Sequence, residues 1–510
     1  MSNIDKFLLG IDSGLTVTKA VLFDTKGCRR AVSTVRVPRH TPAPRHVERD
    51  MEQAWDLTAQ AIKNLLDANL PDHGEILGIG VTGHGDGLYA IDDQLRPVRH
   101  AILSLDGRAH AILEEWRESG VLEDALRLTG QKPLVSSPAP LLAWLKENEP
   151  QHYREIEWVM SCKDWLRFKL TGVVSTDITE ASASFTNVET QRYDEGSLSL
   201  YNLDEVSKCL PPVAECSEVV GHVTRDATRK TGLPLGLPVV AGLHDVTAAA
   251  IGMGVTSPGT LSVVAGTYSI NEVISTEPVR QEGWACRNSF RRGEWMNMAI
   301  SPASSSNIDW FLQNFCKREL EIAEESDQSV FDLLQEEVES AFADSSQVIF
   351  HPFLYGSPLS DSASSGFFGI RGWHERGHMM RAVYEGISFN HRMHVEALAS
   401  RFSLSRARAG GGGAQNPLLI QLFADNFAMP IEITQERSVS ALGAALCAGV
   451  GAGVYETIND AVSQAVAKRQ EYRPDHDRKS RLDGKYKLYC RVAEALSPLW
   501  DRLDSEAPME

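Results

Sequence analysis

Two aspartates far apart in the sequence each follow a short apolar segment that is typical of a buried strand. Asp12 ends the segment 7–11 and opens a Ser-Gly turn, whereas Asp245 follows the segment 239–241 and precedes an Ala-rich helical segment. A carboxylate at a glycine turn can hold Mg²⁺, while small neighbours let backbone N–H groups approach a phosphate. A carboxylate near the positive end of a helix can accept a proton from a substrate hydroxyl. The two motifs together indicate phosphate chemistry.

Each of these motifs also has a structural interpretation. A DSG turn can simply join two strands, and an aspartate before a helix can cap that helix with its side chain. A third motif, GGGAQNP at 411–417, lies between an apparent strand and a helix, where glycines would let a flat ring or a phosphate touch the backbone. It lacks the spacing of a P-loop or of a dinucleotide-binding turn, so a flexible turn is the alternative.

The composition is that of an ordinary globular protein. The 510 residues are 43% hydrophobic and 23% charged, and the net charge is −18. This negative charge argues against nucleic acid or an anionic membrane as the main partner. The eight cysteines form no CxxC pair and are interpreted as reduced thiols. The polar N-terminus does not resemble a signal peptide and no apolar run reaches membrane-spanning length, so we expect a cytoplasmic protein.

The order of the expected elements predicts two α/β domains. Strands and helices alternate along the chain, and each half contains a strand, a turn with Gly and Thr, and a returning strand. A Pro- and Gly-rich stretch ends near Asp245, which predicts domains over 1–246 and 247–510. Ligands favour the cleft between such domains. The clearest expected elements are a strand at 76–82 and helices at 51–68, 122–128, 140–147 and 378–398.

A series of further motifs runs through the chain. The most specific is SGFFGI at 365–370, followed by HMMRAVYE at 378–385. The others include DSGLTVTK, GHGDG, SLDGR, TDITEAS, GLHD, AGTYS and GGGAQNP. In this order the motifs resemble the FGGY family of carbohydrate kinases, within the actin-like ATPase superfamily. The resemblance covers roughly residues 7–453 and implies two ribonuclease-H-like domains with a catalytic cleft between them.

The resemblance implies ATP as the phosphate donor, Mg²⁺ as its metal ion and a sugar hydroxyl as the acceptor. Asp12 would be the metal-associated aspartate of the first phosphate loop, Lys19 its basic neighbour, and Asp245 the general base. Leu15 stands where the family usually has Thr, so Thr16 or Thr18 would supply the hydroxyl. The implied ATP-binding residues are Ser13, Gly14, Thr16, Thr18, Lys19, Gly266, Thr267, Gly411, Gly412, Ala414 and Asn416.

The same resemblance implies a sugar site in the first domain. In the loop GHGDG, Gly85 and Asp86 stand where xylulose-type kinases often have Met-His and glycerol kinases have Arg-Glu. Gly85 leaves space and Asp86 offers two acceptors to hydroxyls, although a solvated turn residue is the alternative for Asp86. Asp106 could instead pair with Arg108 as part of the structure. The implied substrate-binding residues are His84, Asp86, Asp106 and Asp245.

The choice of substrate rests on a few motifs. Three motifs look most like those of the L-xylulose kinase branch, namely AILSLDGRAH, SPAPLLAWLKENEP and GLHDV. A pentulose such as L-xylulose is therefore expected. The GDG turn is also similar to that of erythritol kinases, which leaves erythritol, erythrulose or a glycerol-type polyol as alternatives. A rival from a different class is an actin-like ATPase that uses ATP as a conformational switch and has no sugar substrate. A homodimer is the assembly we expect, if the chain assembles.

Overall fold

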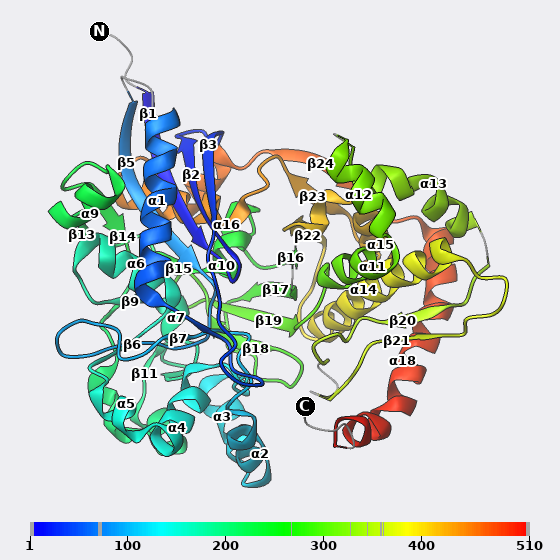
Figure 1. Cartoon of the computed structure of the whole chain (residues 1–510), viewed down its shortest axis with the longest axis horizontal. Helices are drawn as coiled ribbons and strands as arrows, with labels where there is room; N and C mark the ends of the chain where they lie inside the picture. Colours follow the sequence, from blue (N-terminus) through cyan, green and yellow to red (C-terminus); the bar gives the residue numbers. More distant parts are fainter. Residues whose placement is uncertain are drawn as a thin grey trace. The chain divides into compact units, whose positions relative to one another are not determined.

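The computed structural model describes residues 5–69, 74–266, 268–326, 328–343, 345–357, 360 and 362–505 (Figure 1). The chain divides into two compact units. The first comprises Met1–Pro258, Ile274–Asn297 and Ser438–Ala467, and the second comprises Gly259–Val273, Met298–Arg437 and Lys468–Glu510. Each unit combines a mixed β-sheet with helices, which confirms the expected two-domain α/β fold.

The first unit is built on a sheet with the strand order β13-β14-β5-β1-β2-β3, and β15 pairs with the carboxyl end of β5. β1 runs parallel to β5 and antiparallel to β2. Because side chains alternate across a strand, the two faces of the sheet need separate cover. The strands span Asp5–Ser13 (β1), Val17–Asp24 (β2), Arg29–Arg36 (β3), Gly74–Gly83 (β5), Val219–His222 (β13), Pro238–Val240 (β14) and Leu243–His244 (β15).

One face of this sheet is covered by α1 (Met51–Asn69), which lies along the strands in Figure 1. Trp55 and Ile62 of α1 are buried in the same apolar cluster as Leu9 and Ile11 of β1. The helical spacing of apolar residues in 51–68 predicted this helix, and burial of its apolar stripe is what stabilises it against the sheet.

The other face is covered by α16 (Val439–Gly451), which approaches the strands unusually closely. A Cβ on Gly10 would lie 2.0 Å from the carbonyl oxygen of Ala441, and a Cβ on Gly80 would lie 1.9 Å from that of Ala444. Glycine at both strand positions therefore lets the helix backbone touch the sheet.

A helix from late in the sequence thus completes the first core. α10 (Asp245–Gly252) packs on α16 in turn, and a Cβ on Gly252 would lie 1.9 Å from the Val439 carbonyl oxygen. The division into compact units consequently differs from a single boundary after residue 246. The small side chains in α16 permit this close approach.

The remaining elements of the first unit carry several candidate residues. α2, α3 and α4 bury a second apolar cluster that includes Trp116 and Leu141. The elements are α2 (His110–Glu118), α3 (Val121–Thr129), α4 (Pro138–Asn148), β6 (Tyr89–Ile91), α6 (Cys162–Thr171), α7 (Ile178–Ala181), α9 (Arg225–Thr231) and β18 (Ala285–Asn288).

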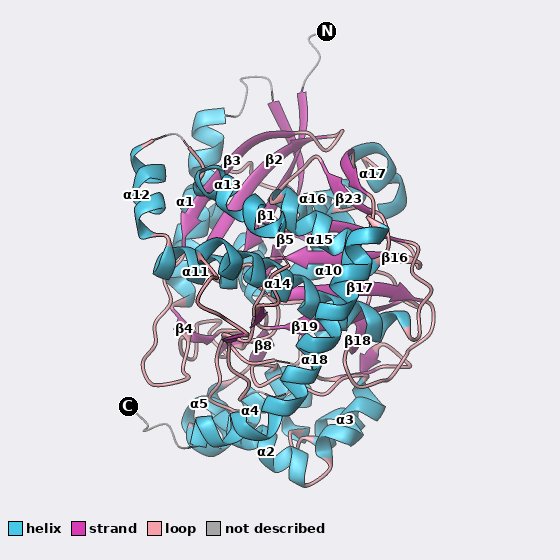
Figure 2. Cartoon of the chain, turned by 90° about the vertical axis from the view of Figure 1, so that its right-hand side faces the viewer, coloured by secondary structure: helices cyan, strands magenta, loops and turns pink. Residues whose placement is uncertain are grey.

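The strands β19-β17-β16-β22-β23-β24 pair in this order, and most of their residues belong to the second unit. β16 pairs antiparallel with β17 and parallel with β22, which repeats the arrangement of β1 with β2 and β5. α14 lies against α11, α13, α15 and α18 (Figure 2). These elements span β16 (Thr260–Ala265), β17 (Ser269–Ser275), β19 (Trp295–Ser301), β22 (Arg406–Gly410), β23 (Ile431–Thr434), β24 (Lys468–Tyr472), α11 (Ser306–Phe315), α13 (Val330–Ala343), α14 (Arg376–Ala399), α15 (Pro417–Phe427) and α18 (His476–Ser505).

The clearest expected elements are all present. Their bounds differ from those predicted by at most two residues, as α3, α4 and α14 illustrate. Among the described residues, no helix is both long and apolar enough to cross a membrane.

Candidate functional site

The carboxyl ends of three neighbouring strands meet at one edge of the first sheet. In β5, Thr82 pairs with Asp12 of β1 on one side and with Leu243 of β15 on the other. Both outer strands run parallel to β5, so the residues that follow all three strands emerge at the same edge. The first glycine turn, the GHGDG loop and Asp245 are therefore brought together within the first unit.

Asp12 lies beside the tight turn between β1 and β2. It pairs with Lys19 across the hairpin, and the backbone N–H of Gly14 donates to the Val17 carbonyl at 2.9 Å. Burial raises the pKa of Asp12, and Lys19 opposes this rise only in part. A divalent cation beside the carboxylate would offset the effect of burial, so Asp12 fits the metal role that the resemblance implies.

No cluster of three or more His, Cys, Asp or Glu side chains that could hold a metal ion occurs in the part of the chain that the structure describes. A metal ion at Asp12 would therefore depend on one protein carboxylate together with water and substrate phosphates. That donor set suits Mg²⁺, which usually keeps several waters and binds through one or two carboxylates plus phosphate oxygens.

Thr16 and Thr18 were the two alternatives for the hydroxyl missing at Leu15. Thr18 is buried, and its Oγ1 lies 2.9 Å from Ser13 Oγ, so the two hydroxyls satisfy each other. Thr16 is exposed. Between the two, Thr16 is the residue whose hydroxyl a ligand could reach.

Arg49 fixes the first turn from within the protein. Its side chain is fully buried, and its guanidinium donates to the carbonyl oxygens of Gly14, at 3.3 Å, and of Leu15. These bonds orient the turn so that its backbone N–H groups can face a phosphate. The sequence holds no motif that identifies Arg49, which lies 34 residues beyond Leu15.

His84 follows β5 and is buried. Its backbone N–H donates to the Ser13 carbonyl at 2.9 Å, its Nε2 lies 3.0 Å from Tyr89 Oη, and its Nδ1 lies 3.4 Å from Ser104 Oγ. Burial, aided by the nearby Arg49 guanidinium, lowers the pKa of His84 to about 3. His84 is therefore a neutral hydrogen-bonding group at neutral pH.

Asp86 is not a solvated turn residue. It is buried and adopts a φ of 54°, a left-handed conformation that Asp tolerates better than most residues. Its carboxylate forms an ion pair with Arg287, with 3.0 Å between Nη2 and Oδ1, and accepts a hydrogen bond from Ser137 Oγ at 3.0 Å. Burial opposes ionisation, but Arg287 and Ser137 hold the pKa of Asp86 below its usual value.

Asp245 is the first residue of α10 rather than a loop residue before it. The N-cap residue is His244, whose Nε2 lies 3.7 Å from Asp245 Oδ1. The capping alternative therefore does not describe Asp245. Burial, with a further contribution from Arg287, lowers the pKa of His244 to about 4, so this imidazole is neutral. The carboxylate of Asp245 benefits from the positive end of the helix.

Three buried donors anchor the segment that leads to Asp245. Thr82 Oγ1 donates to the Leu243 carbonyl at 2.7 Å. Arg167 Nη1 and Lys163 Nζ donate to the Ala241 carbonyl at 2.7 and 3.3 Å. These contacts fix the backbone just before the helix, which holds the candidate base in place.

The Asp106 carboxylate accepts hydrogen bonds from groups of the protein at both oxygens. Its Oδ1 accepts from Arg108 Nε at 2.8 Å, and its Oδ2 accepts from Arg108 Nη2 at 2.9 Å and from the Val47 N–H at 2.5 Å. The expected alternative, pairing with Arg108, thus occurs. Both carboxylate oxygens of Asp106 are therefore occupied, as both oxygens of Asp86 are by Arg287 and Ser137.

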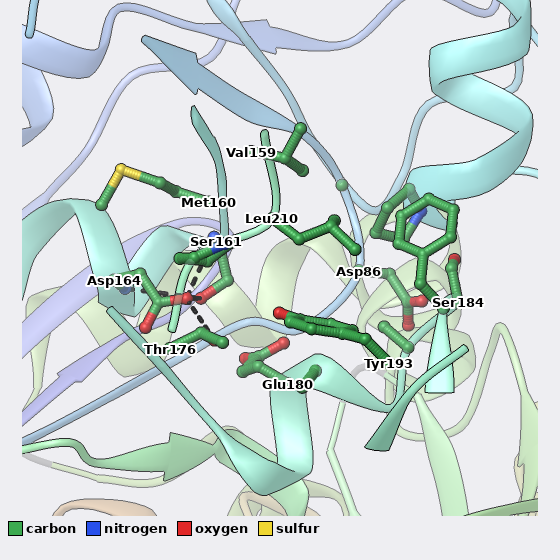
Figure 3. Close-up of a pocket in the computed structure, with 16 residues that line it drawn as sticks. Asp86, Val159, Met160, Ser161, Asp164, Thr176, Glu180, Ser184, Tyr193 and Leu210 are labelled. Atoms are coloured by element: carbon green, nitrogen blue, oxygen red, sulfur yellow. Dashed lines mark hydrogen bonds between the residues drawn. The ribbon is translucent and has the colours of Figure 1, made fainter. Parts of the chain in front are cut away.

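A small cavity adjoins Asp86. Figure 3 shows Glu180, Tyr193 and Leu210 around it, with Asp164 at its other end. Its volume of about 40 Å³ suits a few water molecules but not a sugar. Burial raises the pKa of Glu180 well above its usual value, which favours the protonated acid.

The turn that the resemblance implies as the second phosphate loop lies in the second unit, between β16 and β17. The Gly266 carbonyl accepts hydrogen bonds from the Ser305 N–H at 3.0 Å and from Ser305 Oγ at 2.5 Å. Thr267, which the resemblance implies as a phosphate contact, lies outside the described residues. Ser305 precedes α11, so the start of this helix holds one side of the turn.

The glycine run after β22 forms a turn and a short 3₁₀ segment before α15. Gly411 has a φ of 88°, and a Cβ there would lie 3.0 Å from the Ala265 carbonyl oxygen. No heavy atom of the described chain lies within 4 Å of the position of a Cβ on Gly412, so this residue faces open space. Ala414 is buried.

Asn416 caps the helix that follows. Its Oδ1 accepts from the Leu419 N–H at 3.2 Å, and its Nδ2 donates to Tyr384 Oη at 3.0 Å. The side chain is therefore occupied within the second unit, and Gly412 is the part of this turn that is open to a ligand.

Comparison with known proteins decides the class of enzyme. Residues 7–252 match the N-terminal domain, and residues 261–452 the C-terminal domain, of the FGGY family of carbohydrate kinases. The chain belongs to this family. This FGGY protein is therefore an ATP-dependent carbohydrate kinase, as the motifs predicted, and an ATPase switch without a sugar substrate is not favoured.

Individual relatives cover nearly all of this FGGY kinase. It is 33% identical to the L-xylulose/3-keto-L-gulonate kinase of Escherichia coli (strain K12), over 98% of this chain and 99% of that protein. It is 27% identical to the erythritol kinase of Brucella abortus (strain 2308), over 98% of both chains. The xylulose kinase structure from Rhodospirillum rubrum aligns with a TM-score of 0.85 at 25% identity, over 97% of this chain and 100% of that one.

Proposed function

We propose that this kinase transfers the γ-phosphate of ATP, with Mg²⁺, to a hydroxyl of a pentulose, with L-xylulose as the first candidate. The observation that carries the proposal is the meeting of Asp12, the GHGDG loop and Asp245 at the ends of β1, β5 and β15. One carboxylate suited to a metal ion and one suited to a proton thus flank a loop rich in hydrogen-bonding groups. The identity to a relative named for L-xylulose supports the pentulose.

Asp245 would act as the general base. Its place in the first turn of α10 favours the carboxylate, which would accept the proton of the sugar hydroxyl as that oxygen attacks the γ-phosphorus. The anchored segment before it would keep the base in register with the sugar. His84, Asp86 and Asp106 are the implied contacts to other hydroxyls of the substrate, and each would share these hydrogen bonds with the protein partners described above.

The phosphates of ATP would contact the two glycine turns. In the first turn, Thr16 would offer its exposed hydroxyl, Ser13 and Gly14 would line the approach of the phosphates, and Lys19 would supply a nearby positive charge. The implied contacts in the second unit are Gly266, Thr267, Gly411, Gly412, Ala414 and Asn416. When bound, Mg²⁺ would neutralise charge that develops on the phosphate oxygens, and Asp12 would be its protein ligand.

The decisive experiment is ADP release by the purified enzyme with a panel of acceptors. L-xylulose, D-xylulose, erythrulose, erythritol and glycerol are compared with a sample that contains no sugar. We expect turnover that depends on the sugar and is fastest with L-xylulose. ADP release that is the same with and without sugar would contradict the proposal. A clear preference for erythritol would instead support the polyol alternative, which the similarity to the Brucella abortus erythritol kinase favours.

We also propose a cytoplasmic location, without nucleic acid or membrane as a partner. The net charge of −18 and the eight cysteines, all unpaired, support this. A homodimer stays a prediction. Light scattering would test it, because a dimer has twice the 56.1 kDa mass of the chain.

A further inference from the structure

A buried ion pair belongs to the loop that is proposed to bind the sugar. Arg287 Nη2 lies 3.0 Å from Asp86 Oδ1, and Arg287 Nη1 lies 3.3 Å from Asp86 Oδ2. Each partner is held by a second group, because Ser137 donates to Asp86 at 3.0 Å and Arg287 Nε donates to Gln131 at 2.7 Å. The side chains of Arg287 and Asp86 are only 4% and 9% exposed, so water screens their charges little.

The other ionisable groups beside this loop add little charge. Burial lowers the pKa of His84 to about 3 and that of His244 to about 4, so both imidazoles are neutral at neutral pH. Burial raises the pKa of Glu180 well above its usual value, which favours the neutral form of this acid. Apart from the Asp245 carboxylate, which lies 3.7 Å from His244 Nε2, the Asp86–Arg287 pair is therefore the main ionic feature that a ligand at this loop would meet.

Two further cations of the first unit are engaged elsewhere. Arg49 directs its guanidinium to the carbonyl oxygens of the first glycine turn. Lys163 pairs with Asp164 at 2.6 Å and with Asp177 at 2.8 Å, and all three side chains are buried. Neither cation can turn to a ligand at Asp86 without leaving buried partners unpaired, which is costly.

We propose that the Asp86–Arg287 pair makes this kinase select neutral ketoses and reject sugars that carry a carboxylate. The inference rests on the proposed function and names the substrate class of the same site. A hydroxyl can donate to Asp86 Oδ2, whose contacts with Arg287 are long at 3.3 Å, and leave the shorter contacts at Oδ1 intact. A substrate carboxylate would compete with Asp86 for Arg287 and place two negative charges in a buried site.

The test compares L-xylulose with 3-keto-L-gulonate, a neutral sugar and a sugar acid that are named together for the Escherichia coli relative. We expect the wild-type enzyme to favour L-xylulose by about 100-fold or more in kcat/KM. Asp86→Asn removes one negative charge at constant size and frees Arg287 to pair with the acid. We expect this variant to lose activity on L-xylulose while its kcat/KM for 3-keto-L-gulonate rises about tenfold or more.

Two matched variants complete the design. The double variant Asp86→Asn/Arg287→Gln removes both charges, so it should again discriminate against the acid. Asp92→Asn changes the Asp92–Arg96 pair, whose arginine side chain is 66% exposed, and should leave both rates unchanged. Because Asp86→Asn leaves a buried arginine unpaired, its melting temperature is also measured with and without 3-keto-L-gulonate, which should raise it.

Several outcomes would overturn the inference. A wild-type preference below about tenfold would do so, as would a folded Asp86→Asn variant that binds and uses the acid no better than the wild type. If Asp86→Asn does not fold, the double variant is used instead. Efficient phosphorylation of 3-keto-L-gulonate by the double variant would then overturn the inference. If no neutral sugar is phosphorylated, the proposed function fails and the inference with it. If L-xylulose is a substrate and the acid is used equally well, only the inference fails.

Discussion

The imidazole of His244 fills the space that a side chain at residue 85 would need. A Cβ on Gly85 would lie 1.7 Å from His244 Nε2, the same atom that lies 3.7 Å from Asp245 Oδ1. The φ of Gly85 is not in the positive region, so its backbone would accept alanine and the restriction comes from the imidazole. The sequence suggested that Gly85 leaves space for substrate. In the structure that space belongs to His244, which couples the loop to the candidate base.

Gly85→Ala should therefore disturb both stability and catalysis. The added methyl must displace the His244 ring, and overpacking of this kind typically costs about 1–3 kcal/mol in the free energy of unfolding. Because His244 adjoins Asp245, we expect kcat to fall as well. Urea unfolding and steady-state kinetics on the best substrate would measure the two effects.

The control is the double variant Gly85→Ala/His244→Ala, which removes the ring that the methyl meets. If the clash is the cause, the double variant should be more stable than the sum of the two single changes predicts, by about 0.5–3 kcal/mol. Strictly additive effects would show that residue 85 acts through something other than His244.

Asp245→Asn should fold normally and lose phosphoryl transfer. The amide keeps the size of the side chain but cannot accept the hydroxyl proton, and a general base is typically worth about 10²–10⁴-fold in rate. Sugar-dependent ADP release would measure the loss. Asp226→Asn is the matched control, because Asp226 also lies in the first turn of a helix, α9, and its side chain is 83% exposed. A variant at 245 that kept more than about a tenth of the wild-type turnover would remove Asp245 from the role of base.

Local pattern was enough to predict much of this fold. The apolar spacing in α1 and the strand–turn–strand motif around Asp12 each depend on neighbours a few residues away, so the sequence predicted both. The resemblance added the order of the domains. It did not predict that α16 packs on β1 and β5, because that contact joins residues more than 400 positions apart, such as Gly10 and Ala441.

The candidate site shows the same division. Asp12 and Asp245 stand in motifs that indicate their chemistry, and both follow strands that pair with β5, while their roles stay predictions. Arg287 could not be found from the sequence, because it lies 201 residues from Asp86 and no motif surrounds it. Burial also decided between alternatives that the sequence left open, since Asp86 could equally have been solvated.

Asp12→Asn should weaken the binding of Mg²⁺ more than it weakens the binding of sugar, so the variant should need more Mg²⁺ to reach half of its maximal kcat. The neutral amide is a poorer ligand for Mg²⁺, and even loss of an outer partner of a metal ligand typically costs about 10–100-fold in metal affinity. Titration of kcat with Mg²⁺ and calorimetry of sugar binding without nucleotide would separate the two. Asp24→Asn, in β2 of the same hairpin, changes a carboxylate that pairs with Arg30 and serves as the control. An unchanged Mg²⁺ requirement in Asp12→Asn would contradict the metal role.

The burial of Glu272 in the second unit predicts that the stability of the protein depends on pH. This residue of β17 is fully buried, and its Oε2 accepts from Ser262 Oγ at 3.0 Å. Its Oε1 has no hydrogen-bond partner among the residues that the structure describes. Burial raises the pKa of Glu272 from 4.5 to about 7. Between these values the folded protein keeps a proton that the unfolded chain releases, so the free energy of unfolding falls as the pH rises through this window.

Glu272→Gln removes that ionisation while it keeps the shape of the side chain and its bond to Ser262. The difference in free energy of unfolding, variant minus wild type, should therefore increase from pH 4.5 to pH 7 and level off above it. Because a tenfold difference in proton affinity corresponds to about 1.4 kcal/mol, the whole change should be of a few kcal/mol. Urea unfolding at a series of pH values would follow it, with the exposed Glu277→Gln as the control. A difference that stays constant across the window would show that Glu272 does not hold a proton in the folded protein, and that its burial is compensated by a partner.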